Sequence, residues 1–170
     1  MTATTPQQVA VLLAPGFPMM AFAAALEPLR AANRIAGKSL YAWTLASTDG
    51  RAVRASNGIP IGVGAAIADS GQPERLVVCA GLDPLGFIRE EPRLRRQLPR
   101  LAARGCEVGG ISGGPYVLAE AGLLDGRRCT VHWEYAEDFR TRYPRARLLP
   151  DLYVRDGRIF TCSGGTAAST

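Results

Sequence analysis

The stretch CEVGGISGGPYVLAEA, residues 106–121, carries the pattern that decides the fold of this chain. Its first residues, 106–111, form a short apolar run that predicts a strand, and residues 114–121 predict the start of a helix. The glycines between them predict a sharp strand-to-helix turn, because glycine lets the backbone pass closely and leaves room for a ligand. We call residues 109–115 the Ser112 elbow and expect it to be the functional centre.

The same alternation of strand and helix runs along the rest of the chain. Further strands are predicted at residues 9–14, 41–47, 75–80, 148–154 and 158–162, the last two flanking a turn at Asp156-Gly157. Helices are predicted at 19–36, in the arginine-rich stretch after Pro84, and at 134–142, and Asn57-Gly58 predicts a hairpin within 53–63. This alternation predicts an α/β fold: a three-layer, flavodoxin-like, mostly parallel sheet with helices on both faces.

Glycines follow three of the predicted strands at the edge of the sheet where their carboxyl ends meet. They are Gly16, Gly81 and the pair Gly109-Gly110. In open parallel α/β sheets, ligands bind at this edge. We therefore expect the binding site to lie there.

Composition indicates one ordinary globular domain. The chain has 170 residues, of which 47% are hydrophobic and 21% are charged. No apolar run reaches the roughly 18 residues of a membrane span, and the first residues do not resemble a signal peptide, so we expect a cytoplasmic protein without membrane contact. The four cysteines form no C-x-x-C pair, and His132 is the only histidine. We therefore expect free thiols, no metal site and no cofactor.

The net charge of +5 raises the question of nucleic-acid binding. Arginines concentrate in FIREEPRLRRQLPRLAARG, residues 87–105, where acidic and apolar residues interleave. Leu94, Leu98 and Leu101 recur there at helical spacing, and the arginines around them are Arg93, Arg95, Arg96, Arg100 and Arg104. This pattern favours a solvated helix face over a DNA-binding surface.

Ser112 has two interpretations. Residues 110–114 fit G-x-S-x-G, the turn that presents a serine nucleophile, and His132 is the base that this chemistry needs. The structural interpretation is a tight strand–helix crossing with a serine at the helix cap. The acids Glu120, Asp125 and Glu134 have no spacing that singles out one of them as a partner. In both cases the free N–H groups and dipole of the following helix favour a carboxylate or an oxyanion.

Beyond these motifs, the chain resembles the ThiJ/PfpI (class I glutamine-amidotransferase-like) superfamily, and within it the amino-terminal domain of GlxA-type regulators of the AraC family. The resemblance lies in VAVLLAPGF (9–17), MMAFAAALEPLRAANR (19–34), VVCAGLDP (77–84), GGISGGPYVLAEAGLLDGRRCTVHWEY (109–135) and the carboxyl-terminal DGRIFTCSGGTAAST. The segment 109–135 is the most specific of these.

The resemblance also locates the positions that carry chemistry in the superfamily's enzymes. Ser112 occupies the position of their cysteine nucleophile, Ala21 that of an acidic residue, and His132 that of a histidine. Because the acid and the thiol are both missing, the resemblance implies binding rather than catalysis. The alternative is a ThiJ/PfpI-type hydrolase or related enzyme with Ser112 as nucleophile and His132 as base.

The regulators that the chain resembles imply a ligand-sensing domain over residues 1–170, a helix-turn-helix DNA-binding domain beyond residue 170, and a homodimer. The ligand they imply is a small nitrogenous metabolite of the amino acid, betaine or carnitine type. We expect its carboxylate on the N–H groups of Gly113 and Gly114 and its cation on an aromatic face, with Glu134 as a weaker candidate. The expected ligand-binding residues are Ser112, Gly113, Gly114, His132, Trp133, Gly81, Phe17 and Met20, with Phe22 and Tyr116 as further aromatic candidates.

Overall fold

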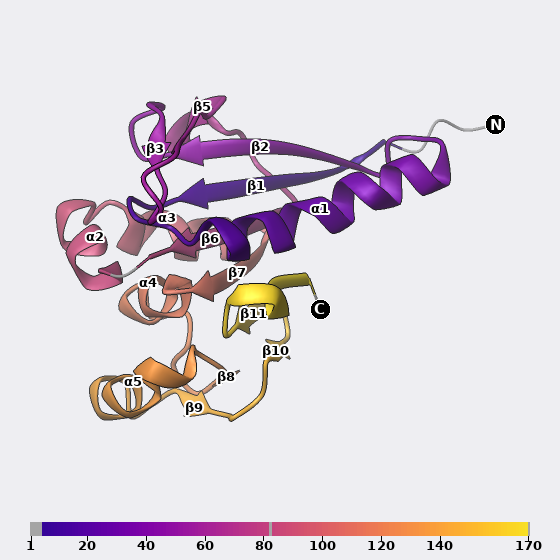
Figure 1. The fold of residues 1–170 in the computed structure, drawn as a ribbon. Coiled ribbons are helices and arrows are strands. Elements are labelled where there is room, and N and C mark those ends of the chain that lie inside the picture. The colour runs from indigo at the N-terminus through magenta and orange to yellow at the C-terminus, as the bar shows by residue number, and fades with distance from the viewer. Residues whose placement is uncertain (1–4, 82, 170) are drawn as a thin grey trace.

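The computed structural model of the chain describes residues 5–81 and 83–169. Within these residues the central sheet has seven strands: β1 (Gln7–Leu13), β2 (Tyr41–Ser47), β5 (Ala65–Ala66), β6 (Arg75–Ala80), β7 (Glu107–Ser112), β10 (Tyr153–Asp156) and β11 (Ile159–Cys162). Their order is β10-β11-β7-β6-β1-β2-β5, and every neighbouring pair is parallel except β10 and β11 (Figure 1). The run β2-β1-β6-β7-β11 is the strand order of flavodoxin-like sheets, so the predicted fold is confirmed.

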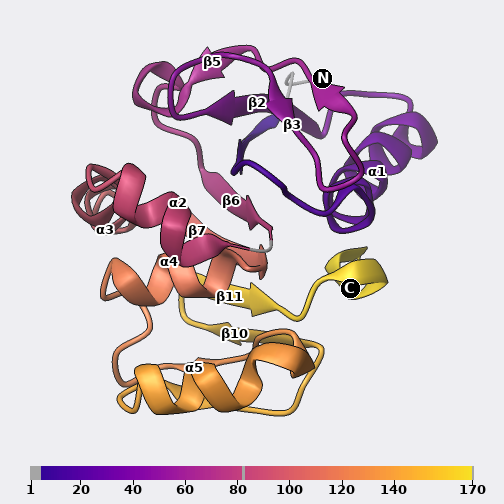
Figure 2. The same cartoon turned by 60° about the vertical axis from the view of Figure 1, so that its left-hand side comes forward.

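Helices cover both faces of this sheet. One face carries α1 (Met19–Ala36) and the short helix η3 (Gly165–Ser169), and the other carries α2 (Pro84–Glu90), α3 (Leu94–Ala103), α4 (Gly114–Glu120) and α5 (Ala136–Arg142) (Figure 2). Alternate strand residues supply the two cores. Leu12 and Leu76 pack toward the α2–α5 face, whereas Val11 and Val77 pack toward α1.

Several predicted elements coincide with the structure. The predictions of a helix over 19–36 and strands over 41–47 and 75–80 match α1, β2 and β6. The helix α1 ends at Gly37, which has φ 63° in the left-handed region where glycine is favoured. The hairpin is also confirmed, since β3 (Val53–Arg54) and β4 (Pro60–Ile61) pair antiparallel around Asn57-Gly58.

Other predicted elements differ from the structure. The prediction of a single arginine-rich helix is wrong, because the chain forms two helices, α2 and α3, with a break near Pro92. The ring nitrogen of proline has no hydrogen to donate to the helix. The strand predicted over 148–154 is two separate pieces, β9 (Arg147–Leu148) and β10, interrupted near Pro150. The structure adds β5 and β8 (Arg128–Cys129), the latter paired with β9, and the short helices η1 (Ile67–Asp69) and η2 (Trp133–Tyr135). The predicted helix over 134–142 is η2 followed by α5.

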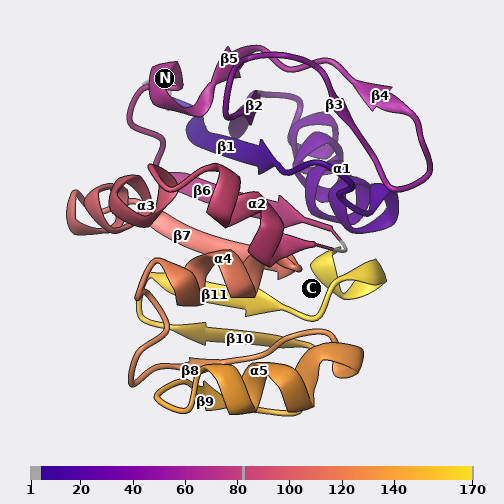
Figure 3. The same cartoon turned by 90° about the vertical axis from the view of Figure 1, so that its left-hand side faces the viewer.

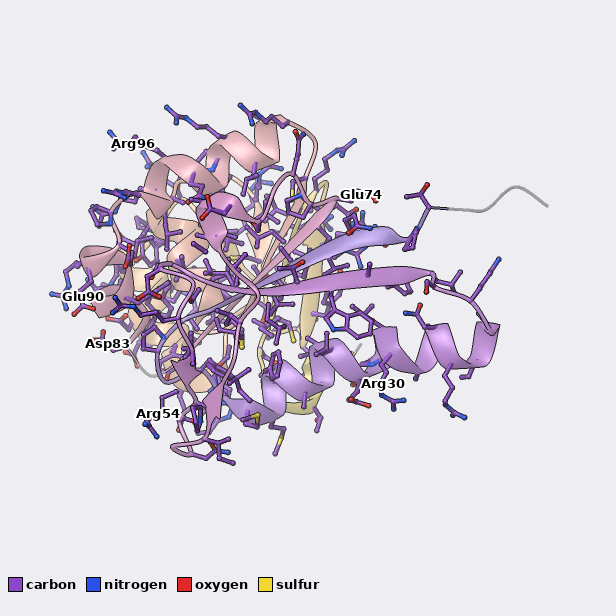
Figure 4. The ribbon with its side chains drawn as sticks, turned by 90° about the horizontal axis from the view of Figure 1, so that it is seen from above. Arg30, Arg54, Glu74, Asp83, Glu90 and Arg96 are labelled. Atoms are coloured by element: carbon purple, nitrogen blue, oxygen red, sulfur yellow. The ribbon has the colours of Figure 1, made fainter. Side chains whose placement is uncertain are left out.

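The arginine-rich stretch has the amphipathic arrangement that its sequence predicts. Leu94, Leu98 and Leu101 are buried in the core beneath α3, and the arginines around them are exposed. Figure 4 shows Arg96 pointing away from the body of the molecule. One of these arginines, Arg95, pairs with Glu120 of α4 at 2.9 Å. The interpretation as a solvated helix face agrees with this arrangement.

All four cysteines are buried and none is disulfide-bonded. Cys79 lies in β6 and has no exposed surface, as its apolar sequence context predicts. Across the described part of the chain, no helix is long and apolar enough to span a membrane.

Candidate functional site

The site lies at the edge of the sheet where the parallel strands end. The carboxyl ends of β1, β6, β7 and β11 point to the same side of the molecule (Figure 3). Ser112 closes β7 and Gly113 follows it directly, before α4 begins at Gly114. The strand-to-helix turn that the sequence predicts is therefore present.

Ser112 adopts an unusual backbone conformation. Its φ is +58°, and it is the one non-glycine residue with positive φ among those the structure describes. An L-residue in the left-handed region costs roughly 1–2 kcal/mol, so the surrounding packing must hold this conformation. Strained residues of this kind cluster at ligand-binding and active sites, which marks the elbow as a candidate site.

The glycines beside Ser112 are required for close backbone packing. A Cβ atom on Gly113 would lie 2.5 Å from the carbonyl oxygen of Gly81, and one on Gly114 would lie 2.2 Å from that of Val78. A Cβ atom on Gly110 would lie 2.6 Å from the carbonyl carbon of Gly114. No side chain fits at these distances, so the glycines seat α4 against β6.

This packing contradicts part of the expected ligand contact. The N–H of Gly113 donates to the carbonyl oxygen of Ala80 at 3.0 Å, so it is not free for a carboxylate. Gly113 and Gly114 are both buried. The two residues shape the elbow, and the prediction that both present free N–H groups to a ligand is wrong for Gly113.

Gly81 and Phe17 are also packing residues. A Cβ atom on Gly81 would lie 1.8 Å from the carbonyl oxygen of Gly16, so the turns after β1 and β6 are in direct backbone contact. Phe17 has no exposed surface and packs edge-on against the ring of Phe22, with ring centroids 5.5 Å apart. The side chain of Phe17 belongs to the core and leaves no surface for a ligand, and its expected ligand contact stays a prediction.

The aromatic candidates divide sharply by exposure. Phe22 and Tyr116 are buried, and the Tyr116 hydroxyl donates to Asp138 at 2.9 Å. Trp133 is 77% exposed, and Met20 is 62% exposed. Among the expected aromatic contacts, Trp133 therefore has a free face.

A second turn, which sequence reasoning missed, closes on the elbow from β11. A Cβ atom on Gly164 would lie 3.0 Å from both Cα and Cβ of Ser112, and Gly164 has φ +94°. Its N–H donates to the sulfur of Cys162 at 3.4 Å. This second turn could have been predicted from Ser163-Gly164-Gly165, because these small residues follow a strand, as Ser112-Gly113-Gly114 do at the elbow.

His132 lies at the start of η2 and has one defined polar neighbour. Its Nδ1 is 3.4 Å from both the N–H and a carboxylate oxygen of Glu134. These two contacts are alternatives: Nδ1 accepts from the backbone N–H, or a protonated Nδ1 donates to the carboxylate. The other acids considered earlier are engaged elsewhere, Glu120 with Arg95 and Asp125 with Arg145. Glu134 is thus the acid that the structure places beside His132.

The comparison with protein families decides the identity of this fold and elbow. Residues 7–170 match the model of the DJ-1/PfpI family. The chain belongs to the DJ-1/PfpI family. The ThiJ/PfpI resemblance of the sequence is thereby confirmed, and it covers the sheet, the elbow and the turn after β11.

Within the DJ-1/PfpI family the chain is similar to transcriptional regulators. It is 44% identical over 157 residues to the HTH-type transcriptional regulator CdhR of Pseudomonas aeruginosa, which covers 92% of this chain and 46% of that protein. It is 38% identical over 161 residues to the HTH-type transcriptional regulator GlxA of Rhizobium meliloti, which covers 95% of this chain and 49% of that protein. The chain therefore matches a GlxA-type regulator over about half the length of these curated relatives.

A solved structure agrees with this assignment. The crystal structure of an AraC family transcriptional regulator from Pseudomonas putida is 29% identical, with a TM-score of 0.84. The match covers 96% of this chain and 87% of that one. The DJ-1/PfpI fold is therefore shared along almost the whole chain.

The DJ-1/PfpI chain lacks a thiolate at its elbow. Ser112 stands there, and Ala21, the position that the sequence resemblance assigns to the enzymes' acid, is buried and apolar. The chain's own cysteines do not replace the missing nucleophile. Burial raises the pKa of Cys79 to about 12 and the pKa values of Cys106 and Cys129 to about 11, and it also raises that of Cys162. All four therefore stay protonated near neutral pH, and the thiol is the unreactive form.

Proposed function

We propose that this DJ-1/PfpI domain is the ligand-sensing part of a transcriptional regulator that binds DNA through a separate helix-turn-helix domain. The observation that carries the proposal is the similarity to CdhR and GlxA over more than nine-tenths of the chain but only about half of each regulator. A ligand changes the activity of such a regulator when it binds one conformation of the protein more tightly than another and so shifts the equilibrium between them. The chemistry of the elbow supports binding over turnover.

The ligand we propose is a small nitrogenous metabolite of the amino acid, betaine or carnitine type, held beside the Ser112 elbow. Ser112 and His132 are both partly exposed, so a hydroxyl and an imidazole are available to an oxygen of the ligand. Trp133 adjoins His132, with ring centroids 5.5 Å apart, and its exposed face suits a cation. Hydrogen bonds from Ser112 and His132 to the carboxylate, with the Trp133 ring against the cation, would together recognise a zwitterion.

Calorimetric titration of the 170-residue chain tests this function. We expect saturable binding of at least one of glycine betaine, L-carnitine or L-arginine, and no chemical change of the bound compound by mass spectrometry. Heat changes indistinguishable from dilution for amino acids, betaines and polyamines alike would count against the proposal. Conversion of the compound would replace it with an enzymatic function.

A second candidate function is hydrolysis with Ser112 as nucleophile. Two observations favour it: the strained backbone of Ser112, and the placement of Glu134 3.4 Å from His132 Nδ1, where a carboxylate can orient a basic imidazole. The buried Ala21 opposes it, since no acid supports the nucleophile from that position. Hydrolysis of p-nitrophenyl acetate by wild type and by Ser112→Ala decides the matter. We expect equal background rates, and a Ser112-dependent rate would support the enzyme.

We also propose that the domain forms a homodimer, because the regulators it resembles imply one. Apolar side chains are available on the candidate faces: Met20 on α1 is 62% exposed, and Ile59 in the β3–β4 hairpin is 52% exposed. Sedimentation velocity of the wild-type chain and of Met20→Glu and Ile59→Glu tests this. A wild-type chain that sediments as a monomer at 100-fold different concentrations contradicts the proposal.

A further inference from the structure

The edge of the sheet opposite the Ser112 elbow is rich in arginine. The strands β6, β7 and β11 begin there, on the left of Figure 3. The strand β8 begins at the same edge, since the N–H of Arg128 donates to Asp156, the last residue of the antiparallel β10, at 2.9 Å. We use the name basic edge for the arginines in or next to the strand ends on this side: Arg75, Arg104, Arg127, Arg128, Arg145, Arg147, Arg155 and Arg158.

The basic edge holds most of the net charge of the chain. Its eight arginines face four carboxylates, so its formal charge is +4, whereas the whole chain carries +5 and its other charges nearly cancel. The four carboxylates are Glu74, Glu107, Asp125 and Asp156. Such an excess produces a positive potential that extends over roughly one Debye length, about 8 Å at physiological salt.

Two of these carboxylates each bridge two guanidinium groups. Glu107 accepts from one arginine at 2.7 Å and also pairs with a second. Asp156 lies 3.7 Å and 4.0 Å from the guanidinium nitrogens of its two arginines. The bridged pairs are Arg75 and Arg155 on Glu107, and Arg127 and Arg128 on Asp156. Each bridge leaves one positive charge in excess and holds both side chains in place, so less entropy is lost when the edge binds an anion.

Three arginines of the basic edge have no carboxylate partner. Arg104, Arg147 and Arg158 are exposed, and none of them forms an ion pair within residues 5–81 and 83–169. Arg158 donates one N–H to the carbonyl oxygen of Gly105, which orients its guanidinium group. These three side chains are therefore available to an anion.

Two of the unpaired arginines line one cavity. Arg104 and Arg158 border a space of about 420 Å³ where β1, β6 and β7 begin. Two carboxylates also line it, but Glu107 is neutralised by its arginines, and Glu74 accepts from the N–H of Gln8 at 3.1 Å. A guanidinium group is planar, always charged and able to bind two phosphate oxygens at once. The arginine side of this cavity therefore suits a phosphate group.

We propose that the basic edge is a docking surface for the phosphate backbone of double-stranded DNA. The inference rests on the proposed function, because the helix-turn-helix domain of a regulator would hold this domain beside its DNA site. A short flexible linker raises the effective concentration of the DNA to about millimolar, so a weak contact adds to the affinity of the whole regulator.

The position of the basic edge fits this role. Phosphate contacts fix orientation and carry no sequence information, so the helix-turn-helix domain alone reads the bases. The elbow lies at the other ends of the same strands, after Ser112 closes β7. A domain that rests on DNA through the basic edge therefore leaves the elbow open to its ligand.

Fluorescence anisotropy of a labelled 20-base-pair duplex, titrated with the 170-residue chain, tests the surface. We expect two unrelated sequences to bind equally, and the affinity to fall about 10- to 100-fold between 50 and 200 mM NaCl, because phosphate contacts release counterions. Arg104→Gln, Arg147→Gln and Arg158→Gln should each lower the slope of log K against log salt by about 1.

Two further variants control for charge. Arg96→Gln removes the same charge from α3, where the side chain points away from the body of the molecule (Figure 4), and should leave the slope unchanged. Glu74→Gln keeps an oxygen for the N–H of Gln8 and makes the basic edge more positive, so it should tighten binding. Circular dichroism confirms the fold of each variant.

Several results would overturn the proposal. No anisotropy change at 50 mM NaCl removes DNA as the partner, and so does binding of poly-L-glutamate without binding of DNA, which indicates an acidic protein segment. An equal loss in Arg96→Gln and in the three edge variants shows an effect of net charge alone.

The sensing function is measured separately. The three edge variants should keep the affinity of the wild-type chain in calorimetric titrations with glycine betaine, L-carnitine and L-arginine, because the basic edge lies away from the elbow. A failed DNA titration therefore leaves the sensing function standing. A chain that binds DNA but none of these compounds supports the basic edge and counts against the proposed ligand.

Discussion

Replacing Thr161 by valine tests whether the buried hydrogen bond between Thr130, which follows β8, and Thr161 of β11 stabilises the fold. The N–H of Thr130 donates to Thr161 Oγ1 at 2.7 Å, and both residues are 1% exposed. Valine keeps the volume but removes the acceptor, which leaves a buried N–H without a partner. Such a group costs about 1–3 kcal/mol. For a chain of this length, each kcal/mol lowers the melting temperature by about 2–4 °C, so we expect a decrease of about 2–12 °C.

Urea denaturation and amide exchange measure this effect. With an m-value of about 2 kcal/mol/M, the midpoint is expected to fall by about 0.5–1.5 M at unchanged slope. The amide of Thr130 should exchange faster than in wild type. Thr141→Val is the matched control, because the Thr141 hydroxyl bonds to Glu137 on the exposed face of α5, and a change within about 0.5 kcal/mol is expected. Equal stability of the two variants, or an unchanged Thr130 exchange rate, would refute the reasoning.

Three further predictions follow from packing and charge. Gly81→Ala places a Cβ atom 1.8 Å from a backbone oxygen and should lower the free energy of unfolding by about 1–3 kcal/mol, as measured by thermal denaturation. Gly62→Ala is the control, because the space around Gly62 is open, and it should lower the free energy of unfolding by less than about 0.5 kcal/mol. Equal effects of the two substitutions would contradict the packing. Leu98→Ala in the core beneath α3 should cost about 2–5 kcal/mol in urea denaturation, and a loss below 1 kcal/mol would place Leu98 outside the core. The Arg142 guanidinium, with the Tyr116 hydroxyl, holds the pKa of Asp138 below its usual range, so its contribution is present above about pH 3.9 and is lost as pH falls through the folded pKa. Asp138→Asn should therefore destabilise the chain slightly at pH 7, and the difference from wild type should shrink as the pH falls below about 3.9. A difference that stays constant from pH 7 to pH 2.5 contradicts the ion pair.

Long elements with a clear period could be predicted from the sequence. The helix α1 has 18 residues and a glycine stop, and β6 is a continuous apolar run, so local patterns determine both. The strands β8 and β9 have two residues each and show no period. Their pairing depends on contacts between residues 128–129 and 147–148, which no local pattern reveals. The break between α2 and α3 was foreseeable from Pro92, but the leucine spacing across the stretch obscured it.

The position of the elbow could be predicted from the sequence, but its backbone contacts could not. The glycines and serine of the elbow identify the turn, and the family resemblance singles out His132. The partner of the Gly113 N–H was not predictable, because the acceptor is Ala80 on a neighbouring strand. The difference in exposure between Phe17 and Trp133 also depends on the tertiary fold, since both are aromatic residues next to a turn or a short helix. The sequence shows the residue types at the edge of the sheet, and the packing decides which of them are exposed.

The backbone contacts among Gly81, Gly113 and Gly114 have a consequence for how this gene can change. Any nucleotide change that alters a glycine codon introduces a side chain or a stop, and no side chain fits against the carbonyl groups at these positions. The turn is thus closed to stepwise mutation, whereas Trp133 lies on exposed surface where substitutions cost little stability. Under the proposed sensing function, a lineage that acquires a new inducer is expected to do so through exposed side chains such as Trp133, on an elbow that stays the same.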